Sequence, residues 1–299
     1  MTDDRNEMHS GQLTEEDRKF FASMGRGGVG FTGDTRAESS TGEHAINASD
    51  PDIDFDEMIE ELVNTFYTGG PNAFAQLIDS HRRQLTVASL MSERLKRIVV
   101  SGLRLGVEAG SGECANELGA LYYTGGIVDQ DYLKAAELYG MAASQGILQA
   151  ILNLGYIYEY GRLGEPDYQM AYMFFSYAAA TAQSPEALYK MGDFFSKGKG
   201  VERDLGAAYV LWSQSLARAQ ELDDIENEAQ ASYRIARTLM SHSKCEEIGI
   251  AQDFMAALKL FQTAEIGLRI SIDKGLTYYQ GRLEKAMKGQ QRARKKLGD

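Results

Sequence analysis

The residues of this 299-residue chain with the clearest chemical potential are its four histidines and two cysteines. His242 and Cys245 lie three positions apart beside Glu246 and Glu247, a spacing that could contribute to a metal site. A structural zinc site needs four nitrogen or sulfur ligands, and the sequence offers no second pair of such residues. We therefore interpret the segment as a polar inserted loop and predict no metal.

Other candidate sites are equally incomplete. The acidic run at residues 221–228 could bind a cation, but nothing in its spacing fixes the carboxylates, so we interpret it as a solvated helix end. The glycines of residues 25–30 match a dinucleotide-binding pattern, but they lack the strand and helix which that pattern requires. No nucleophile–base pair has a recognisable signature. We predict no catalytic residue and no cofactor.

Charge and composition exclude further classes of protein. The chain carries 31 Lys and Arg against 43 Asp and Glu, a net charge of -12, whereas nucleic-acid binding needs a cationic surface. Two cysteines cannot form a disulfide framework. The acidic start precedes no apolar run, and no stretch approaches the ~18 apolar residues that span a bilayer. We expect a cytoplasmic protein that binds neither nucleic acid nor membranes.

An internal repeat is the strongest pattern in the sequence. The equivalent glycines Gly119, Gly155 and Gly192 lie 36 and then 37 residues apart. A small residue lies five positions before each glycine. Tyr or Phe follows three positions after the glycine, a second Gly six positions after it, and Asp twelve positions after it. A large aromatic residue follows at twenty, namely Tyr139, Phe175 or Trp212. This regularity predicts a chain of similar structural units.

The offsets predict a pair of antiparallel helices in each unit. Small residues on one helical stripe let a second helix approach closely. The glycine six positions after the repeat glycine ends the first helix. The Asp twelve positions after it caps the second helix. One pair cannot cover its own apolar face, so neighbouring pairs must stack. Cys114 fills a small-residue position and Trp212 an aromatic one. We therefore expect both side chains to be structural.

The motif Ala-x-x-x-Leu-Gly-x-x-Tyr-x-x-Gly-x-Gly-Val, followed by Asp, Ala, an aromatic residue and Ala-Ala, resembles the SEL-one-like repeat. Residues 187–215 show it best. The resemblance implies an all-α fold, an α-solenoid of stacked antiparallel helix pairs in a right-handed superhelix, like the tetratricopeptide repeat. Such repeats commonly act as adaptors. Some relatives have been credited with hydrolysis of β-lactam-like compounds, but those are secreted and cysteine-rich, unlike this chain.

The repeat, together with the polar, Gly- and Ser-rich composition of the N-terminal segment, predicts five regions along the chain. They are a disordered acidic tail at 1–53 that could hold a short helix at 14–24, a degenerate repeat or cap at 54–110, three clear repeats at 111–220, a divergent repeat at 221–268 with an insertion between its helices, and a C-terminal capping helix at 269–299. Residues 66–70 echo residues 122–126, and residues 275–281 are interpreted as another first-helix core.

By analogy with related repeats, the first helices should line a concave face. The positions that packing leaves free there are rich in tyrosine, a residue with large contact area and little rotamer entropy to lose. The predicted partner-binding residues are Tyr123, Tyr156, Glu159, Tyr160, Tyr189, Asp193, Lys197, Tyr233 and Arg237. These predict a non-enzymatic scaffold for a protein or peptide. The alternative is that several of these rings fill gaps between units.

The acidic N-terminal region suggests a second hypothesis, self-regulation. Residues 1–60 carry 15 acidic and 5 basic side chains, whereas residues 282–299 carry 7 basic and 2 acidic ones. The tail could be attracted to basic patches of the same chain and place Phe20 and Phe21 of segment 14–24 in the groove.

Overall fold

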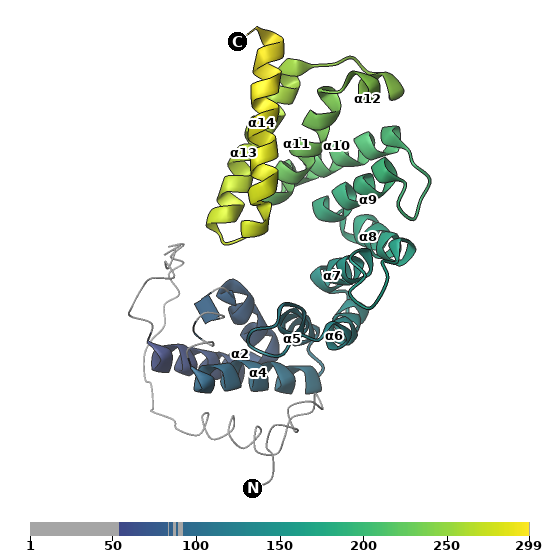
Figure 1. Cartoon of the computed structure of the whole chain (residues 1–299). Coiled ribbons are helices and arrows are strands. Elements are labelled where there is room, and N and C mark those ends of the chain that lie inside the picture. Colours follow the sequence, from purple (N-terminus) through teal and green to yellow (C-terminus); the bar gives the residue numbers. More distant parts are fainter. Residues whose placement is uncertain (1–53, 83, 86–87, 89–91, 299) are drawn as a thin grey trace. The chain divides into compact units, whose positions relative to one another are not determined.

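The computed structural model describes residues 54–298 apart from 83, 86–87 and 89–91, and within them every regular element is helical. The predicted tail and its helix at 14–24 lie outside this range. The chain divides into two compact units, residues 1–150 and 151–299, which are described separately. In both units, helices that follow one another in the sequence pack side by side (Figure 1). The all-α, stacked helix-pair prediction is confirmed.

The first unit contains four described helices. They are α2 (Phe55–Ser80), α4 (Glu93–Glu108), α5 (Gly112–Thr124) and α6 (Tyr132–Ser144). Helix α2 packs on α4 and α5, and α5 packs on α6. Helix α2 is interrupted at Gly70, with φ 79° and ψ -179°, nearly the conformation of Gly125 (φ 73°, ψ -166°) at the end of α5. The resemblance of residues 66–70 to residues 122–126 thus extends to the backbone.

The second unit holds the remaining helices. They are α7 (Leu148–Glu159), which begins just before it, α8 (Tyr168–Ala182), α9 (Pro185–Lys197), α10 (Leu205–Glu221), α11 (Ile225–Leu239), α12 (His242–Glu247), α13 (Phe254–Asp273) and α14 (Gln280–Leu297), with a 3-10 turn η2 (Thr277–Tyr279) before α14. The first helix of each pair contacts the first helix of the next, α9 on α11 and α11 on α14. Second helices pack between them, α10 against α9 and α11, and α13 against α11 and α14.

The aspartates predicted to begin the second helices do so. Each accepts a hydrogen bond from the backbone N–H three residues later, at 2.8 to 3.0 Å, a set that comprises Asp131, Asp167, Asp204 and Asp253. Such a cap contributes about 1 kcal/mol. In the first three copies, the backbone N–H of the same aspartate also bonds the carbonyl of the aromatic residue nine positions earlier, at 2.9 to 3.0 Å. The connection between the helices is therefore fixed in the same way each time.

The repeat glycines lie directly under the aromatic rings of the second helices. A Cβ atom at Gly155 would lie 2.8 Å from Phe175, and one at Gly192 would lie 2.5 Å from the Trp212 indole. Glycine is required at Gly155 and Gly192 because the ring packs there on the helix backbone itself. Trp212 is buried, and its Nε1 donates to the carbonyl of Tyr189 at 3.2 Å. The structural role predicted for Trp212 is confirmed.

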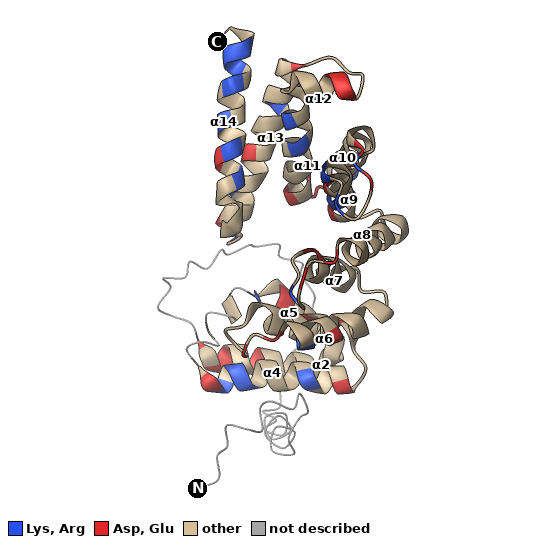
Figure 2. Cartoon of the chain, turned by 45° about the vertical axis from the view of Figure 1, so that its right-hand side comes forward, with Lys and Arg blue, Asp and Glu red and all other residues tan. Residues whose placement is uncertain are grey.

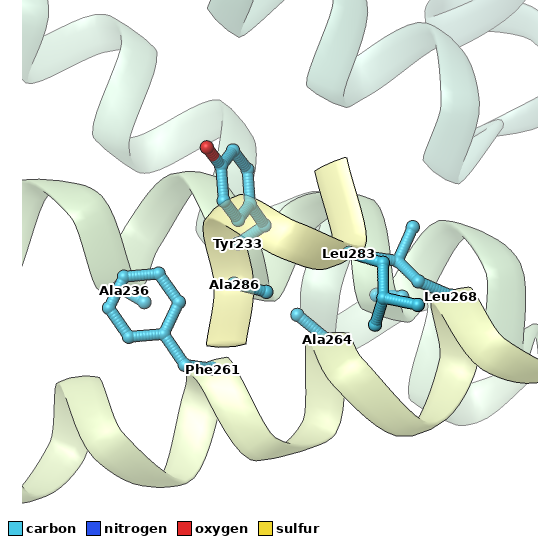
Figure 3. Packing of buried hydrophobic residues seen from close by; sticks show 8 residues of the cluster. Tyr233, Ala236, Phe261, Ala264, Leu268, Leu283 and Ala286 are labelled. Atoms are coloured by element: carbon cyan, nitrogen blue, oxygen red, sulfur yellow. The ribbon is translucent and has the colours of Figure 1, made fainter. Parts of the chain in front are cut away.

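The C-terminal end differs from the sequence prediction. Residues 275–281 are not a first-helix core; they form the turn after α13, the 3-10 turn and the start of α14. The glycine that meets the ring of Phe261 is instead Gly289 on α14, where a Cβ atom would lie 2.5 Å from the ring. Phe261 packs with Ala236 of α11 and Ala286 of α14 in one apolar cluster (Figure 3). The shift arises because α13 extends to Asp273.

The segment after α11 also differs from the sequence prediction. Residues 242–247 form the short helix α12 rather than a loop, and Cys245 is buried with its thiol donating to the Thr238 carbonyl at 3.2 Å. Among the described residues, no group of three or more His, Cys, Asp or Glu side chains is arranged to hold a metal ion.

Candidate functional site

The predicted binding residues fall into two groups. Tyr123 lies in the first unit, half-buried at the end of α5 and edge-to-face with Tyr132 at a centroid distance of 5.3 Å. The other eight lie in the second unit on α7, α9 and α11, apart from Tyr160, which directly follows α7. We call the surface formed by α7, α9, α11 and α14 the first-helix face. It is the only part of the predicted site that the structure brings together within one unit.

Two of the tyrosines predicted to be exposed on this face are buried. Tyr189 and Tyr233 are only 5% and 6% exposed. Tyr189 lies beneath the guanidinium of Arg234, 4.3 Å from its ring centroid, and Tyr233 belongs to the cluster around Phe261. Helical periodicity missed this burial because it describes one helix at a time, whereas here the next first helix covers the ring. For these two residues, the core-packing alternative is correct.

Tyr156 and Tyr160 form the more accessible part of the face. Tyr160 is 53% exposed and stacks on the half-buried Tyr156 at 5.8 Å. The Tyr156 hydroxyl donates to Glu186 Oε1 and lies 3.4 Å from the hydroxyl of Tyr189. Burial, together with the neighbouring Glu226, raises the pKa of Glu186. The hydroxyl therefore holds Tyr156 in place as a support for Tyr160.

A buried ion pair joins α7 to α9. The ammonium of Lys190 contacts the carboxylate of Glu159, and both side chains are almost completely buried. The same ammonium lies 4.8 Å from the ring centroid of Tyr156, within the range of a cation–π contact. Burial lowers the pKa of Lys190, and the attraction of Glu159 opposes that shift. Glu159 is thus engaged within the protein.

A second buried ion pair joins α9 to α11. Arg234 Nε and Nη2 donate to the two carboxylate oxygens of Asp193, each at 2.6 Å. Burial alone would favour neutral Asp193, but the guanidinium of Arg234 outweighs it and lowers the pKa of the carboxyl group. A third Arg234 nitrogen donates to the backbone carbonyl of Gln230 at 2.7 Å. Asp193 is therefore structural as well.

An ion pair at the equivalent position of the first unit has the charges exchanged. Glu117 lies two residues before Gly119 and pairs with Arg82, just as Lys190 and Arg234 lie two residues before Gly192 and Ala236. This position was not among the predicted site residues, although a basic residue recurs there in two successive copies. That recurrence was the available signal.

Two further arginines lie on α11 and α14 around Tyr233. The guanidinium carbons of Arg237 and Arg282 are 5.6 and 5.8 Å from the Tyr233 ring centroid. Arg282 donates to Gln230 Oε1, which also accepts from Arg234 at 3.2 Å. Burial, and then the like charge of Arg234, lower the pKa of Arg282. Figure 2 shows the basic residues of these helices in blue.

The cysteines have the environment of core residues. The Cys114 thiol donates to the Pro71 carbonyl at 3.1 Å and packs against Gly106. Burial raises the pKa of Cys114 to about 11, so the nucleophilic thiolate is scarce at neutral pH. Among the described residues, no helix is long and apolar enough to cross a membrane.

Known proteins share the repeat. The Sel1 repeat family matches residues 112–147, 148–180, 185–218 and 229–265. Two Arabidopsis thaliana proteins, the ERAD-associated E3 ubiquitin-protein ligase components HRD3B and HRD3A, are 43% identical over 54 residues and 42% identical over 55 residues. Each match covers 18% of this chain, and the matches cover 9% and 8% of those proteins. The chain thus matches less than a tenth of the length of these relatives.

Two solved structures are also similar. One is c5321, a protective antigen of uropathogenic Escherichia coli with an SLR fold, at 24% identity and a TM-score of 0.47 over 68% of this chain and 42% of that one. The other is a Sel1 repeat protein from Oxalobacter formigenes, at 21% identity and a TM-score of 0.48 over 79% of this chain and 99% of that one. With four copies of the repeat between residues 112 and 265, the chain belongs to the Sel1 repeat family.

Proposed function

We propose that the chain is a non-enzymatic scaffold or adaptor whose first-helix face binds a protein or peptide. The observation that supports this most directly is the way the face is built. Buried ion pairs from Glu159 to Lys190 and from Asp193 to Arg234 join its helices, while Tyr160, Lys197 and Arg237 are exposed above them. A surface fixed before binding loses little conformational entropy when a partner docks.

The predicted residues have two proposed roles, partner contact for the exposed ones and support for the buried ones. Tyr160, Lys197 and Arg237 are accessible and would contact the partner, with Tyr156 at the edge of that contact. Glu159, Asp193, Tyr189 and Tyr233 would act as supports. Tyr123, in the first unit, would provide a separate contact.

The comparisons agree with an interaction role. The two Arabidopsis relatives are named as components of a ubiquitin ligase, which makes them subunits of an assembly. For this chain, membership of such an assembly is part of the proposal. A cytoplasmic location also remains a prediction, which cell fractionation would test.

The test compares two exposed tyrosines of similar accessibility. Tyr160 on the first-helix face is 53% exposed, and Tyr177 on α8 is 56% exposed. Partners captured by the wild-type chain from lysate of its own organism would be identified by mass spectrometry, purified and titrated by calorimetry. We expect Tyr160→Ala to weaken binding about 10-fold, as loss of an aromatic anchor does, and Tyr177→Ala to leave it unchanged. Equal affinities of the two variants would overturn the proposed face.

A tail-regulated module is the second candidate. Its support is the 15 acidic side chains of residues 1–60 in a chain whose first-helix face carries exposed cations. Attraction of the tail to those cations would fade as salt shortens the screening length to ~10 Å at 0.1 M. Deletion of residues 1–53 should then raise partner affinity at low salt more than at high salt. Unchanged affinity at both salt concentrations would eliminate this candidate.

A further inference from the structure

Arg237 and Arg282 flank one tyrosine on two neighbouring helices. Arg237 is in the last turn of α11 and Arg282 near the start of α14, and both guanidinium carbons lie within 6 Å of the Tyr233 ring centroid, at 5.6 and 5.8 Å. We call Arg237, Arg282 and Tyr233 the arginine site. Arg237 is exposed and Arg282 half-buried, so both can be reached from solvent.

Within the part of the chain that the structure describes, no ion pair neutralises the positive charges of the arginine site. The third guanidinium group of this region, that of Arg234, forms an ion pair with Asp193. Arg282 bonds only the neutral amide oxygen of Gln230, and within the described part of the chain neither Arg237 nor Arg282 pairs with a carboxylate. In a chain with a net charge of -12, the described part of the first-helix face thus has two adjacent cations without a carboxylate partner.

The acidic groups of the face are already engaged. Glu159 pairs with Lys190, and Asp193 with Arg234. Glu186 accepts from Tyr156, and Glu226 accepts from Tyr279 at 2.6 Å. These four carboxylates therefore have partners other than Arg237 and Arg282.

Neighbouring groups add to the positive character on one side. Lys244 of α12 has its pKa lowered by burial and then by the charges of Arg237 and Arg203, so Arg237 faces a second cation. On the other side, close to Arg282, Tyr278 is 69% exposed, and its ring lies 4.3 Å from that of Tyr279 with a tilt of 53°. An aromatic ring and two guanidinium groups are thus presented together.

We propose that the arginine site binds the carboxylates of an acidic segment of the protein partner. This inference rests on the proposed function and specifies the chemistry of its partner. Guanidinium groups bind carboxylates through two parallel hydrogen bonds. Both guanidinium groups lie beside the Tyr233 ring, and the bond to Gln230 orients Arg282 in advance. Half-burial of Arg282 strengthens its attraction for an anion.

An acidic peptide fits the site better than a polyanion. Burial and then the nearby Glu226 carboxylate raise the pKa of Tyr278, so negative charge is present beside the site. A nucleic acid or a densely phosphorylated ligand would be repelled there. An extended peptide can place single Asp or Glu side chains at the two arginines. Its neutral residues can then lie beside the protein's own glutamates.

The experiment measures fluorescence polarisation with two labelled peptides on the full chain. One peptide is rich in Glu and Tyr, and the other has Gln in place of every Glu. At low salt we expect the Glu peptide to bind about 10-fold more tightly than the Gln peptide, with the difference shrinking as salt rises. The double variant Arg237→Gln with Arg282→Gln should bind both peptides equally.

The matched control removes the same charge from another surface of α14. Lys288 and Lys295 are exposed there and have no part in the arginine site. The double variant Lys288→Gln with Lys295→Gln should keep the preference for the Glu peptide, while Arg282→Lys should keep only part of it, because an ammonium lacks the planar fork. Circular dichroism melts check that all variants fold.

Five outcomes would overturn the inference. In two of them the wild-type chain binds both peptides equally or binds neither. In the third, the lysine control loses the preference as fully as the arginine variant. In the fourth, millimolar inorganic phosphate displaces the Glu peptide completely, which indicates a general anion site. A synthetic peptide of residues 1–53 that competes more strongly than the unlabelled Glu peptide would assign the site to the chain's own tail. In each case the Tyr160→Ala titration still tests the proposed function separately.

Discussion

Arg234 on α11 binds both carboxylate oxygens of Asp193 on α9, at 2.6 Å each, and so ties one first helix to the next. Both side chains are largely withdrawn from water. Their attraction is strong only because it operates away from solvent, and for the same reason each charge is costly without the other. The pair therefore fixes the alignment of successive repeats more than it adds net stability.

This coupling predicts a large difference between single and double substitutions. Asp193→Leu alone leaves a buried guanidinium unpaired and should lower the free energy of unfolding by about 3–5 kcal/mol, whereas Asp193→Leu with Arg234→Met should cost less than either single change. Urea denaturation followed by circular dichroism gives the three values. A double variant whose loss equals the sum of the single losses would show that the two charges do not depend on each other.

The close approach of ring and backbone at Gly192 makes the second prediction. In Gly192→Ala the new Cβ would meet the Trp212 indole at 2.5 Å and the Ala208 carbonyl at 3.0 Å. The helices must separate, and unfolding should become easier by about 1–3 kcal/mol. The control is Gly140→Ala on α6, where nothing lies within 4 Å of the added Cβ. That change should stabilise the chain by up to about 1 kcal/mol. Equal effects of the two substitutions would refute the packing argument.

The raised pKa of Glu186 gives a pH-dependent prediction. The folded chain holds this proton more tightly than the unfolded chain, whose carboxyl titrates near 4.5. Stability from this group is therefore present below about 4.5 and is lost as pH rises through the higher folded pKa. In Glu186→Gln, which can still accept from Tyr156, that loss should vanish. Unfolding free energies between pH 4 and 8 for both chains test this, and parallel curves would contradict it.

Positions that depend on one helix pair could be predicted from the sequence. The caps at Asp167 and Asp204 and the glycine–ring contact of Gly192 with Trp212 follow from the spacing within one repeat. Each involves residues that lie on the two helices of the same unit. Local spacing was therefore sufficient.

Positions that depend on the next repeat could not be predicted in this way. Tyr189 was expected on the surface, yet α11 brings Arg234 over its ring. Gly289 was missed because it meets Phe261 from the following first helix rather than from the same pair. Arg282 has a role only because α14 packs on α11. These contacts arise when one repeat packs on the next. The spacing of residues within one repeat carries no information about that packing.

The burial of Trp212 predicts a large loss of stability on truncation. Trp212→Ala removes an indole that packs on Gly192 and donates to the Tyr189 carbonyl at 3.2 Å. The free energy of unfolding should fall by ~3–5 kcal/mol, as for other large-to-small core changes. Guanidinium denaturation measures it. Trp212→Phe keeps most of the packing and should cost less, and a loss below ~1 kcal/mol for the alanine variant would place the indole outside the core.

Cysteine reactivity gives the last prediction. A pKa of about 11 for Cys114 leaves on the order of 0.1% thiolate at pH 8, and burial also raises the pKa of Cys245. Both thiols are covered as well, since they donate to the carbonyls of Pro71 and Thr238. With a disulfide reagent such as DTNB, the folded chain should react at least ~100-fold more slowly than the chain in denaturant, because the thiolate is the reacting species. Cys114→Ser and Cys245→Ser assign each thiol. If a thiol reacts as fast in the folded chain as in denaturant, that thiol is neither buried nor protonated. Such a result would contradict the prediction and would make that cysteine a candidate nucleophile.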